Sequence, residues 1–414
     1  PECVRLPSAV LPLPAAGALM SHPSSQVPFV TVFLLATAGF VSGASMRATD
    51  PLLPTLAREF GVAVADAAFV LTAFTFAYGT FQAIHGPLGD RFGKLRVIAS
   101  GMAAAALAAG LCAFAPTLSV LNTGRFLTGM CAGAVIPLSL AFIGDRFPYE
   151  GRQAVLGRFI AGTLLGQSFG PLIGGVMSDA FGWRSTFGVI AAGFLLLAVL
   201  IGRESMRIGD RGTGHYTPPW KRYATILASP RARPVLATVG IEGILFFGAL
   251  GFVGAHIKET FHLSDTLTGI IVAGFGLGGL TYSFLVKRLV GRLGEAGLVR
   301  AGGWTMALCF LMIGVLPSAA LVAPFVAFQG FAFYMLHNTL QTRATEISPE
   351  ARGAGVSLFA MCLFLGQAVG VALFGWAIHH VGYAVPFIAA GIALWILAEV
   401  FRRSVKRTAG KARA

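Results

Sequence analysis

The chain has 414 residues, of which 56% are hydrophobic and only 12% charged, with a formal net charge of +14. Soluble globular proteins carry roughly 45–50% apolar and about 25% charged residues, so this composition excludes an ordinary soluble domain and indicates an integral membrane protein. The basic residues are scattered over short loops instead of being gathered on one folded face, which argues against a nucleic-acid partner.

The first 27 residues form a separate segment. They begin without Met and contain several prolines, which disfavour both a helix and the apolar core of a signal peptide. We expect a disordered N-terminal segment over 1–27, and Met20 is an alternative start of the protein.

Apolar runs near the roughly 20 residues that cross a bilayer recur along the rest of the chain. The predicted spans form two sets of six, near 28–47, 67–85, 97–115, 121–142, 157–179 and 185–202, and near 235–257, 265–286, 301–316, 321–342, 354–379 and 383–401. The sequence therefore predicts an all-α integral membrane protein with twelve transmembrane helices in two pseudo-symmetric six-helix bundles, 28–202 and 235–402. The polar stretch 203–234, which is interrupted by prolines, would be a cytoplasmic linker, and 403–414 a basic cytoplasmic tail.

An internal repeat supports the two-bundle organisation. The line "GQSFGPLIGG" at 166–175 returns as "GQAVGVALFG" at 366–375, and the offset of 200 residues gives 11 identities over the 38 positions from 150 to 187. Such self-similarity predicts a duplicated structural unit.

The basic residues also predict the orientation. Alternate loops and the C-terminal tail hold 25 of the 31 Lys and Arg residues, and positively charged loops stay in the cytoplasm. We expect a multi-pass protein of the cell membrane, the inner membrane in a bacterium, with both termini cytoplasmic and the lipid bilayer as its surroundings.

Two opposite charges end the first predicted span. Arg47 and Asp50 in "MRATDPLLP" are three residues apart, so they share one helix face and can pair. They are candidates for a proton or substrate pathway, with simple capping at the outer interface as the alternative.

The loop after the second span carries the most specific motif. "GPLGDRFGKLR" resembles the signature G-x-L-x-D-R-x-G-R/K of the major facilitator superfamily. The matching residues are Gly86, Leu88, Asp90, Arg91, Gly93 and Lys94. The counterpart in the second half, "KRLVGRLGE" at 287–295, lacks the acid.

The resemblance implies a gating role for this loop. Asp90 would close the cytoplasmic side by facing the N-terminus of the helix that starts near Gly353, where a carboxylate gains on the order of 0.3–1 kcal/mol from the helix dipole. A solvated acid that pairs with Arg91 is the alternative.

An arginine lies within the fourth predicted span, in "RFLTGMCAGAVIP". A guanidinium inside a membrane costs roughly 2.5–3.5 kcal/mol, so Arg125 should face a wet cavity or a carboxylate. The segment is similar to the superfamily's fourth-helix motif R-x-x-Q-G, with Thr128 in place of the Gln. The alternative is an Arg125 side chain that reaches the outer interface.

The fifth span has a stripe of small residues around a proline. The segment "GTLLGQSFGPLIGG" resembles the motif G-x-x-x-G-P-x-x-G-G, which in this superfamily is associated with antiporters, and the residues concerned are Gly162, Gly166, Gly170, Pro171, Gly174 and Gly175. Small residues at four-residue spacing let another helix approach closely, and the proline favours a kink. We expect this stripe at the interface between the two bundles.

Glu242 is the clearest acid inside a predicted span. An intramembrane carboxylate is a functional candidate, and no basic residue lies within a helical turn of it, so the sequence leaves Glu242 free to take up a proton. We rank it first as proton carrier, ahead of Asp50, whose neighbour Arg47 favours the charged form. Hydrogen bonding to another helix is the alternative for Glu242.

His337 and Asn338, in a polar cluster near the inner end of the tenth span, would line the inner vestibule or bond between helices.

The resemblance implies a secondary transporter similar to the twelve-helix drug:proton antiporters. Its partners would be a small-molecule substrate and protons, its energy source the proton gradient, and its state a monomer, without a cofactor. Efflux or uptake of a sugar, nucleoside or other metabolite is the alternative. We do not expect an enzyme, because no metal-ligand cluster, phosphate loop or nucleophile motif occurs, and a sensor would need a sizeable soluble domain.

Overall fold

The computed structural model describes residues 29–147, 149–212, 220–347 and 352–411. Within these ranges the chain forms helices and no strand, as the composition predicts. The expected N-terminal segment 1–27 lies outside the described residues.

The first bundle is made of the helices up to residue 207. Its elements are α1 (Phe29–Arg47), the 3-10 turn η1 (Asp50–Leu52), α2 (Leu53–Phe60), α3 (Val64–Ala67), α4 (Phe69–Phe92), α5 (Lys94–Ala113), α6 (Leu118–Ala132), α7 (Val135–Arg146), α8 (Tyr149–Phe181) and α9 (Trp183–Arg207).

A short helix in the predicted linker, α10 (Trp220–Ala228), precedes the second bundle. The elements of this bundle are α11 (Ala232–Glu242), the π-helical turn η2 (Gly243–Phe247), α12 (Gly248–Leu250), α13 (Val253–Phe261), α14 (Asp265–Val315), α15 (Ala319–Ala344), α16 (Arg352–Val381) and α17 (Ala384–Lys411).

The membrane crossings agree with the predicted two sets of six once one long helix is divided. The described residues hold 11 helices that are long and apolar enough to cross a membrane. One of them, α14, has 51 residues and non-helical backbone angles at Gly294 (φ 64°, ψ 173°). At 1.5 Å per residue its length is roughly 75 Å, more than twice the hydrocarbon core, so α14 comprises two crossings that meet at Gly294.

The repeated glycines pack in the same way in both bundles. A Cβ atom added at Gly166 would overlap the carbonyl oxygen of Phe40 on α1, and one at Gly170 would lie 2.7 Å from that of Ala44. In the second bundle, a Cβ atom at Gly366 would overlap the carbonyl oxygen of Gly240 on α11. Close backbone approach through small residues thus joins the first and fifth crossings of each bundle.

This packing corrects one expectation. The glycines at 162, 166 and 170 contact α1 of their own bundle, and Gly174 contacts Ala48 directly after α1, so the stripe does not face the other bundle. Pro171 and Gly175 do lie at the bundle interface, because a Cβ atom at Gly269 on α14 would overlap the carbonyl oxygen of Pro171, and one at Gly175 would overlap that of Asp265. Glycines spaced four residues apart predict that one face of a helix is closely packed, but they do not predict which other helix packs against that face.

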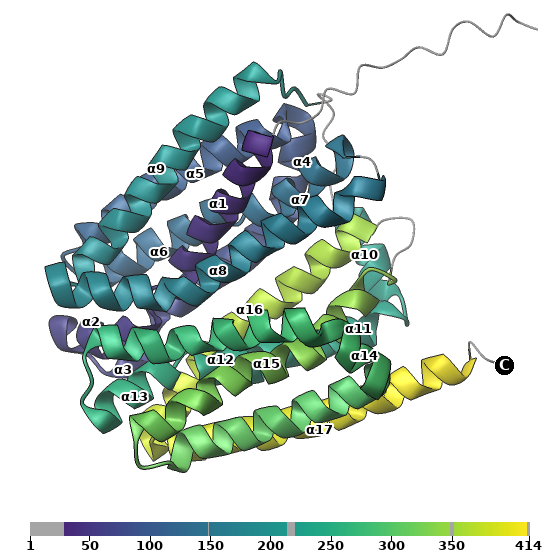
Figure 1. Cartoon of the computed structure of the whole chain (residues 1–414). Coiled ribbons are helices and arrows are strands. Elements are labelled where there is room, and N and C mark those ends of the chain that lie inside the picture. Colours follow the sequence, from purple (N-terminus) through teal and green to yellow (C-terminus); the bar gives the residue numbers. More distant parts are fainter. Residues whose placement is uncertain (1–28, 148, 213–219, 348–351, 412–414) are drawn as a thin grey trace, which may run out of the picture.

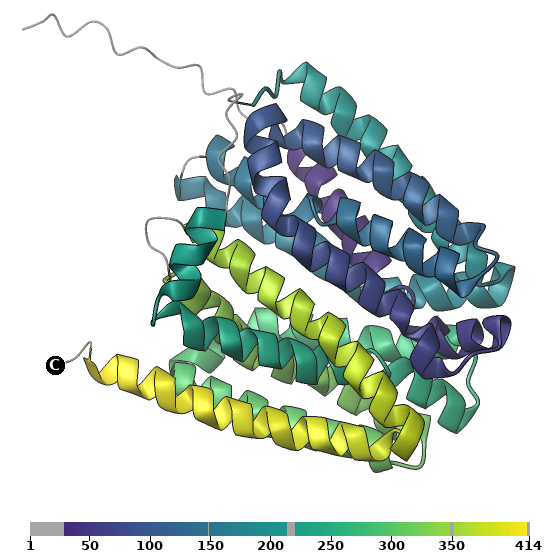
Figure 2. The ribbon, with the colours of Figure 1, turned by 180° about the vertical axis from the view of Figure 1, so that it is seen from behind.

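The two bundles meet at one end and diverge toward the other (Figure 1). We call the end with α2, α3 and α13 the distal end, and the end with α10 and the C-terminal part of α17 the linker end. Figure 2 shows α16 alongside α4; there the rings of Tyr78 and Phe364 are 4.8 Å apart. The tight contacts between the bundles that involve described glycines lie between the distal end and about the level of Gly79.

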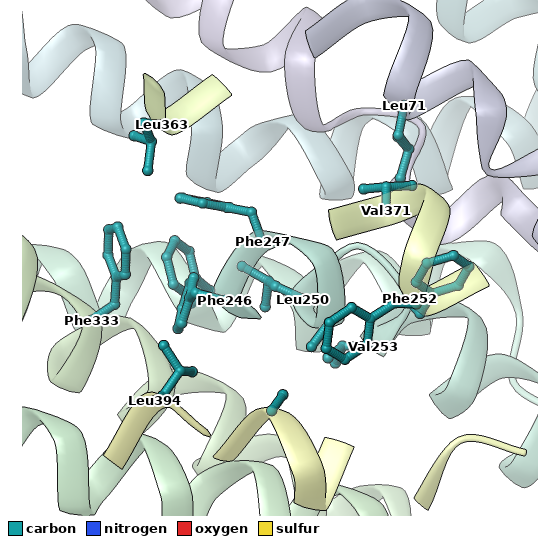
Figure 3. Packing of buried hydrophobic residues seen from close by; sticks show 14 of the residues in the cluster. Leu71, Phe246, Phe247, Leu250, Phe252, Val253, Phe333, Leu363, Val371 and Leu394 are labelled. Atoms are coloured by element: carbon teal, nitrogen blue, oxygen red, sulfur yellow. The ribbon is translucent and has the colours of Figure 1, made fainter. Parts of the chain in front are cut away.

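The core of the second bundle reaches the first bundle near the distal end. Figure 3 shows Leu71 of α4 directed at Val371 of α16, with Phe246, Phe247 and Phe333 packed together on the other side. Phe246 and Phe333 stack with their ring centroids 4.4 Å apart. The stacked rings belong to the second bundle, and Leu71 extends their buried cluster into the first bundle, so this apolar surface stabilises the contact between the two.

The orientation can be tested with single cysteines in a background whose native cysteines are replaced. We expect a cysteine at Arg403, which is exposed at the linker end, to be shielded from an impermeant thiol reagent in whole cells. A cysteine at the exposed distal residue Asp66 should label. Labelling at Arg403 without labelling at Asp66 would reverse the orientation.

The packing of α8 on α1 predicts how substitutions of its glycines affect stability. Gly166→Ala should destabilise the protein by about 1–3 kcal/mol, because the added methyl group overlaps the backbone of α1. Gly157→Ala on the same helix is the control, since nothing lies within 4 Å of the position of its Cβ atom. Thermal unfolding in detergent measures both, and equal melting temperatures for the two variants would refute this account of the packing.

Candidate functional site

The predicted pair at the end of the first crossing is formed and buried. Arg47 Nη2 lies 2.8 Å from Asp50 Oδ2, and their side chains are 4% and 1% exposed. The 3-10 turn that begins at Asp50 places the carboxylate beside the arginine on the preceding helix. The pair is therefore shielded from solvent by the surrounding protein.

Arg125 is also buried, at 1% exposure. Its guanidinium donates to the carbonyl oxygens of Ser45, at 2.9 Å, and Val70, at 3.3 Å, and stacks 4.2 Å above the ring of Phe74. Backbone oxygens and an aromatic face therefore hold the charge in the apolar interior. The side chain does not reach the outer interface, and Arg125 links α6 to α1 and α4.

An aromatic wall on the second bundle faces the charged pair of the first. The guanidinium of Arg47 lies 6.0 Å from the ring centroid of Phe247. Phe247 in turn packs against Phe333, with ring centroids 5.2 Å apart. Charge from one bundle and apolar rings from the other are thus in contact across the bundle interface.

Glu242 has a partner that the sequence did not indicate. It is fully buried on α11, and its Oε2 lies 2.8 Å from Nδ1 of His337 on α15. The other carboxylate oxygen, Oε1, has no hydrogen-bond partner. As expected from the sequence, Glu242 has no basic neighbour on its own helix. The folded chain nevertheless places a basic residue, His337, beside it from another helix.

The backbone next to Glu242 is irregular. The residues that follow it, Gly243–Phe247, form a π-helical turn. A Cβ atom at Gly243 would overlap the carbonyl oxygen of Leu363 on α16, so the glycine permits close contact where the helix widens. Single π-turns inside α-helices occur frequently at functional sites.

The two acid pairs lie at different levels between the two ends of the molecule. A Cβ atom at Gly254 would lie 2.9 Å from the carbonyl oxygen of Asp50, so Asp50 is level with a residue twelve positions beyond Glu242. The guanidinium of Arg47 in the same pair lies 6.0 Å from the ring of Phe247, five positions beyond Glu242, so the two pairs follow one another along the seventh crossing. Glu242 lies toward the linker end and Asp50 toward the distal end.

The motif loop joins α4 to α5 at the linker end. Leu88 lies within α4, Gly93 adopts φ 101° at the turn, and no atom lies within 4 Å of a Cβ atom at Gly86. Lys94 Nζ lies 3.2 Å from Asp90 and 2.6 Å from Asp145 on α7.

Arg91 stacks on the neighbouring ring of Phe92, 5.0 Å from its centroid. Lys94 is thus one described partner of Asp90, in addition to the alternative partner Arg91 that the sequence suggests. The predicted partner of Asp90, the start of the helix near Gly353, falls partly on residues 348–351, which lie outside the described residues.

The first residues of the linker pack on this loop. Asp210 is 6% exposed, and its Oδ2 accepts a hydrogen bond of 2.7 Å from the backbone N–H of Leu95, in the first turn of α5. A Cβ atom at Gly93 would lie 2.8 Å from the carbonyl oxygen of Asp210. A carboxylate at a helix N-terminus is stabilising, and here it comes from the linker.

A polar cluster closes the distal end, and we call it the distal lock: Thr55, Ser178 and Asp179 of the first bundle with Lys258 and Asp265 of the second. Asp265 forms a buried ion pair with Lys258. Its carboxylate also accepts hydrogen bonds from Thr55, at 2.9 Å, and Ser178, at 2.8 Å.

The fifth member of the lock caps a helix across the interface. Asp179 at the end of α8 accepts hydrogen bonds from the backbone N–H groups of Asp265, at 3.2 Å, and Thr266, at 2.7 Å. These are free donors of the first turn of α14. The first bundle thereby satisfies the N-terminus of a helix in the second.

Sequence reasoning missed the distal lock and Asp210. The only local signal was "LSDTLTG" at 263–269, where Ser264 is a typical N-cap before an acidic first turn. Among the described residues, no group of three or more His, Cys, Asp or Glu side chains is arranged to hold a metal ion.

A family comparison agrees with this architecture. The sequence profile of the Major Facilitator Superfamily matches residues 35–253 and again residues 235–413. The chain belongs to the Major Facilitator Superfamily. The two matches overlap at 235–253 and together span both bundles.

Several curated relatives in the superfamily align with most of this transporter. An uncharacterised MFS-type transporter of Bacillus subtilis, YwfA, is 26% identical over 374 residues, 89% of this chain and 90% of the relative. The multidrug resistance protein Stp of Mycobacterium tuberculosis is 24% identical, covering 78% and 71%. The multi-drug resistance efflux pump PmrA of Streptococcus pneumoniae is 24% identical, covering 89% and 95%.

Solved structures support the fold. A bacterial homologue of the human lysosomal transporter Spinster, in an inward-facing conformation, superposes with a TM-score of 0.72 at 15% identity over 93% of this chain and 98% of that one. A POT family transporter in complex with 5-aminolevulinic acid gives a TM-score of 0.75 at 14% identity, covering 90% and 94%. At these identities the likeness concerns the fold alone.

The distal lock predicts a shift in conformation when Asp265 loses its charge. Asp265→Asn leaves Lys258 buried without its counter-ion, a loss that costs about 3–5 kcal/mol in a buried pair, and should favour a conformation with the distal end open. Spin labels at Phe181 and Leu267, one on each bundle, would report a longer distance in pulsed dipolar spectroscopy.

Asp66→Asn is the matched control, because Asp66 is exposed at the same end. It should leave the distribution of distances unchanged. Identical distributions for Asp265→Asn and the wild type would mean that the cluster does not hold the distal end closed.

Proposed function

We propose that the protein is a proton-coupled antiporter that exports a small organic molecule by alternating access. The observation that carries the proposal is a pair of carboxyl groups, one on the first crossing of each bundle, that are at most 1% exposed: Asp50 beside Arg47 and Glu242 beside His337. Intramembrane carboxyl groups are costly, and they mark proton and substrate pathways. The names of the multidrug resistance protein Stp and the multi-drug resistance efflux pump PmrA favour an organic substrate.

The arrangement of the bundles supports alternating access. Two repeats that rock about a site between them are the general mechanism of duplicated carriers. In this conformation the distal lock joins the bundles, while they diverge toward the linker end (Figure 1). With the linker end in the cytoplasm, as the basic loops predict, the structure corresponds to an inward-facing state.

The charged groups suit coupling between a proton and a substrate. A carboxyl group can bind a proton in one conformation and release it in another if its surroundings differ between them. The motif loop and Pro171 lie where the bundles must move, the loop at the linker end and Pro171 against Gly269 of α14. We therefore assign them to gating, as the resemblance to antiporters implies.

Transport in proteoliposomes tests the proposal. Purified protein is reconstituted, and ethidium, tetraphenylphosphonium, a sugar and a nucleoside are offered with and without an imposed pH gradient. Accumulation of a hydrophobic organic compound only with the gradient is the expected result. Transport of sugars or nucleosides alone would favour the alternative substrate class, and transport that ignores the gradient would refute proton coupling.

Variants of the two acids assign the coupling within this assay. We expect Glu242→Gln to abolish gradient-driven accumulation, because the amide cannot carry a proton, and Asp50→Asn to reduce it less. Glu259→Gln is the control on the same crossing, since Glu259 is exposed and bonded to Tyr383. Loss of accumulation in Asp50→Asn alone would reverse the ranking of the two acids.

A further inference from the structure

The pair of Glu242 and His337 joins a fully buried acid to a side chain that is slightly exposed. The carboxylate is 0% exposed and the His337 side chain 9%. A proton cannot reach such a carboxyl group directly from water, whereas the imidazole beside it has two nitrogen atoms, one of which contacts the acid. The contact with His337 therefore gives a route by which a proton can pass between Glu242 and water.

Aromatic rings from two helices fix the imidazole in place. Phe333 of α15 stacks on His337 with ring centroids 4.7 Å apart and planes 18° apart. Phe359 of α16 lies 5.5 Å from the same ring. With Nδ1 at Glu242, Nε2 is the nitrogen of the ring that remains for a second proton.

Other ionisable groups near the pair do not replace His337. His337 is the ionisable side chain that contacts the carboxylate of Glu242 among the described residues. The recorded contacts of two other ionisable residues do not involve Glu242. The carbonyl oxygen of Cys362 on α16 lies 3.7 Å from the Cβ position of Gly240. The hydroxyl group of Tyr282 on α14 accepts a hydrogen bond from Asn338. The Arg47–Asp50 pair lies farther toward the distal end, where Arg47 faces the ring of Phe247.

We propose that His337 is the proton-transfer residue through which Glu242 exchanges protons with the linker end. The inference rests on the proposed antiport and names the path of its proton. Histidine suits this task because its unperturbed charge change falls near physiological pH and its two nitrogens can each carry the proton.

The transfer balances with the atoms present. When substrate binds, the protonated Glu242 donates its proton to Nδ1 of His337, so the O–H bond breaks and an N–H bond forms. The imidazolium then loses its other proton from Nε2 to water at the linker end. The imidazole that remains is neutral and donates from Nδ1 to the Glu242 carboxylate, and the reverse sequence reloads the acid.

The test separates hydrogen bonding from proton transfer. His337→Asn can place an amide N–H near the position of Nδ1, so it can still donate to Glu242, but it cannot pass a proton on. We expect gradient-driven accumulation of the transported compound to fall at least about tenfold, as general acid–base groups contribute that or more. Exchange of labelled for unlabelled substrate without a gradient should persist, because exchange needs no net proton movement.

His256→Gln is the matched control. His256 is a buried histidine of the second bundle whose Nε2 bonds to the backbone oxygen of Ile313 and not to an acid. This variant should keep both activities. If His337→Asn does not accumulate in the membrane, His337→Gln is measured in the same way.

The outcomes distinguish this inference from the proposed function. Accumulation that ignores the gradient in the wild type would refute the antiport itself. A wild type that needs the gradient, together with a His337→Asn variant that accumulates equally well, would refute only the role of His337. Loss of exchange as well as accumulation in both His337 variants would assign His337 to substrate binding or folding and would also overturn the inference.

Discussion

The close approach of two pairs of helices determines where the charges of this protein lie. In each bundle, glycines on the fifth crossing bring its backbone against the first crossing, through Gly166 and Gly170 in one half and Gly366 and Gly370 in the other. The helices that carry Arg47, Asp50 and Glu242 are the ones held in this way. Without that contact, neither buried acid would have a fixed position relative to the partner bundle.

The two halves share a backbone and differ in chemistry. Gly43 and Gly243 are 200 residues apart and make equivalent contacts, the first with Gln167 and the second with Gln367. Four residues beyond them, Arg47 and Phe247 occupy equivalent positions and face each other at 6.0 Å. The two halves thus have the same helix packing, and they differ at this position, where one half has a charged side chain and the other an aromatic ring.

Sequence patterns predicted the parts of the structure that depend on hydropathy and local spacing. Twelve crossings follow from apolar length, and the Arg47–Asp50 pair follows from three-residue spacing on one helix. The partner of Glu242 is 95 residues away in the chain, at His337, and no periodicity connects two positions on different helices. The glycine stripe on α8 was recognised, but its partner was assigned to the wrong bundle for the same reason. The residues of the distal lock lie in loops and at helix ends, where the sequence pattern indicates only ordinary helix capping and not a contact between bundles.

Proton release from the purified protein in detergent tests the account most directly. In weakly buffered solution with a pH indicator, addition of the transported compound should release protons from the wild type and none from Glu242→Gln, while Glu259→Gln should behave as the wild type. This result follows if proton and substrate occupy the protein alternately. Unchanged release from Glu242→Gln, or none from the wild type while the substrate binds, would contradict the account.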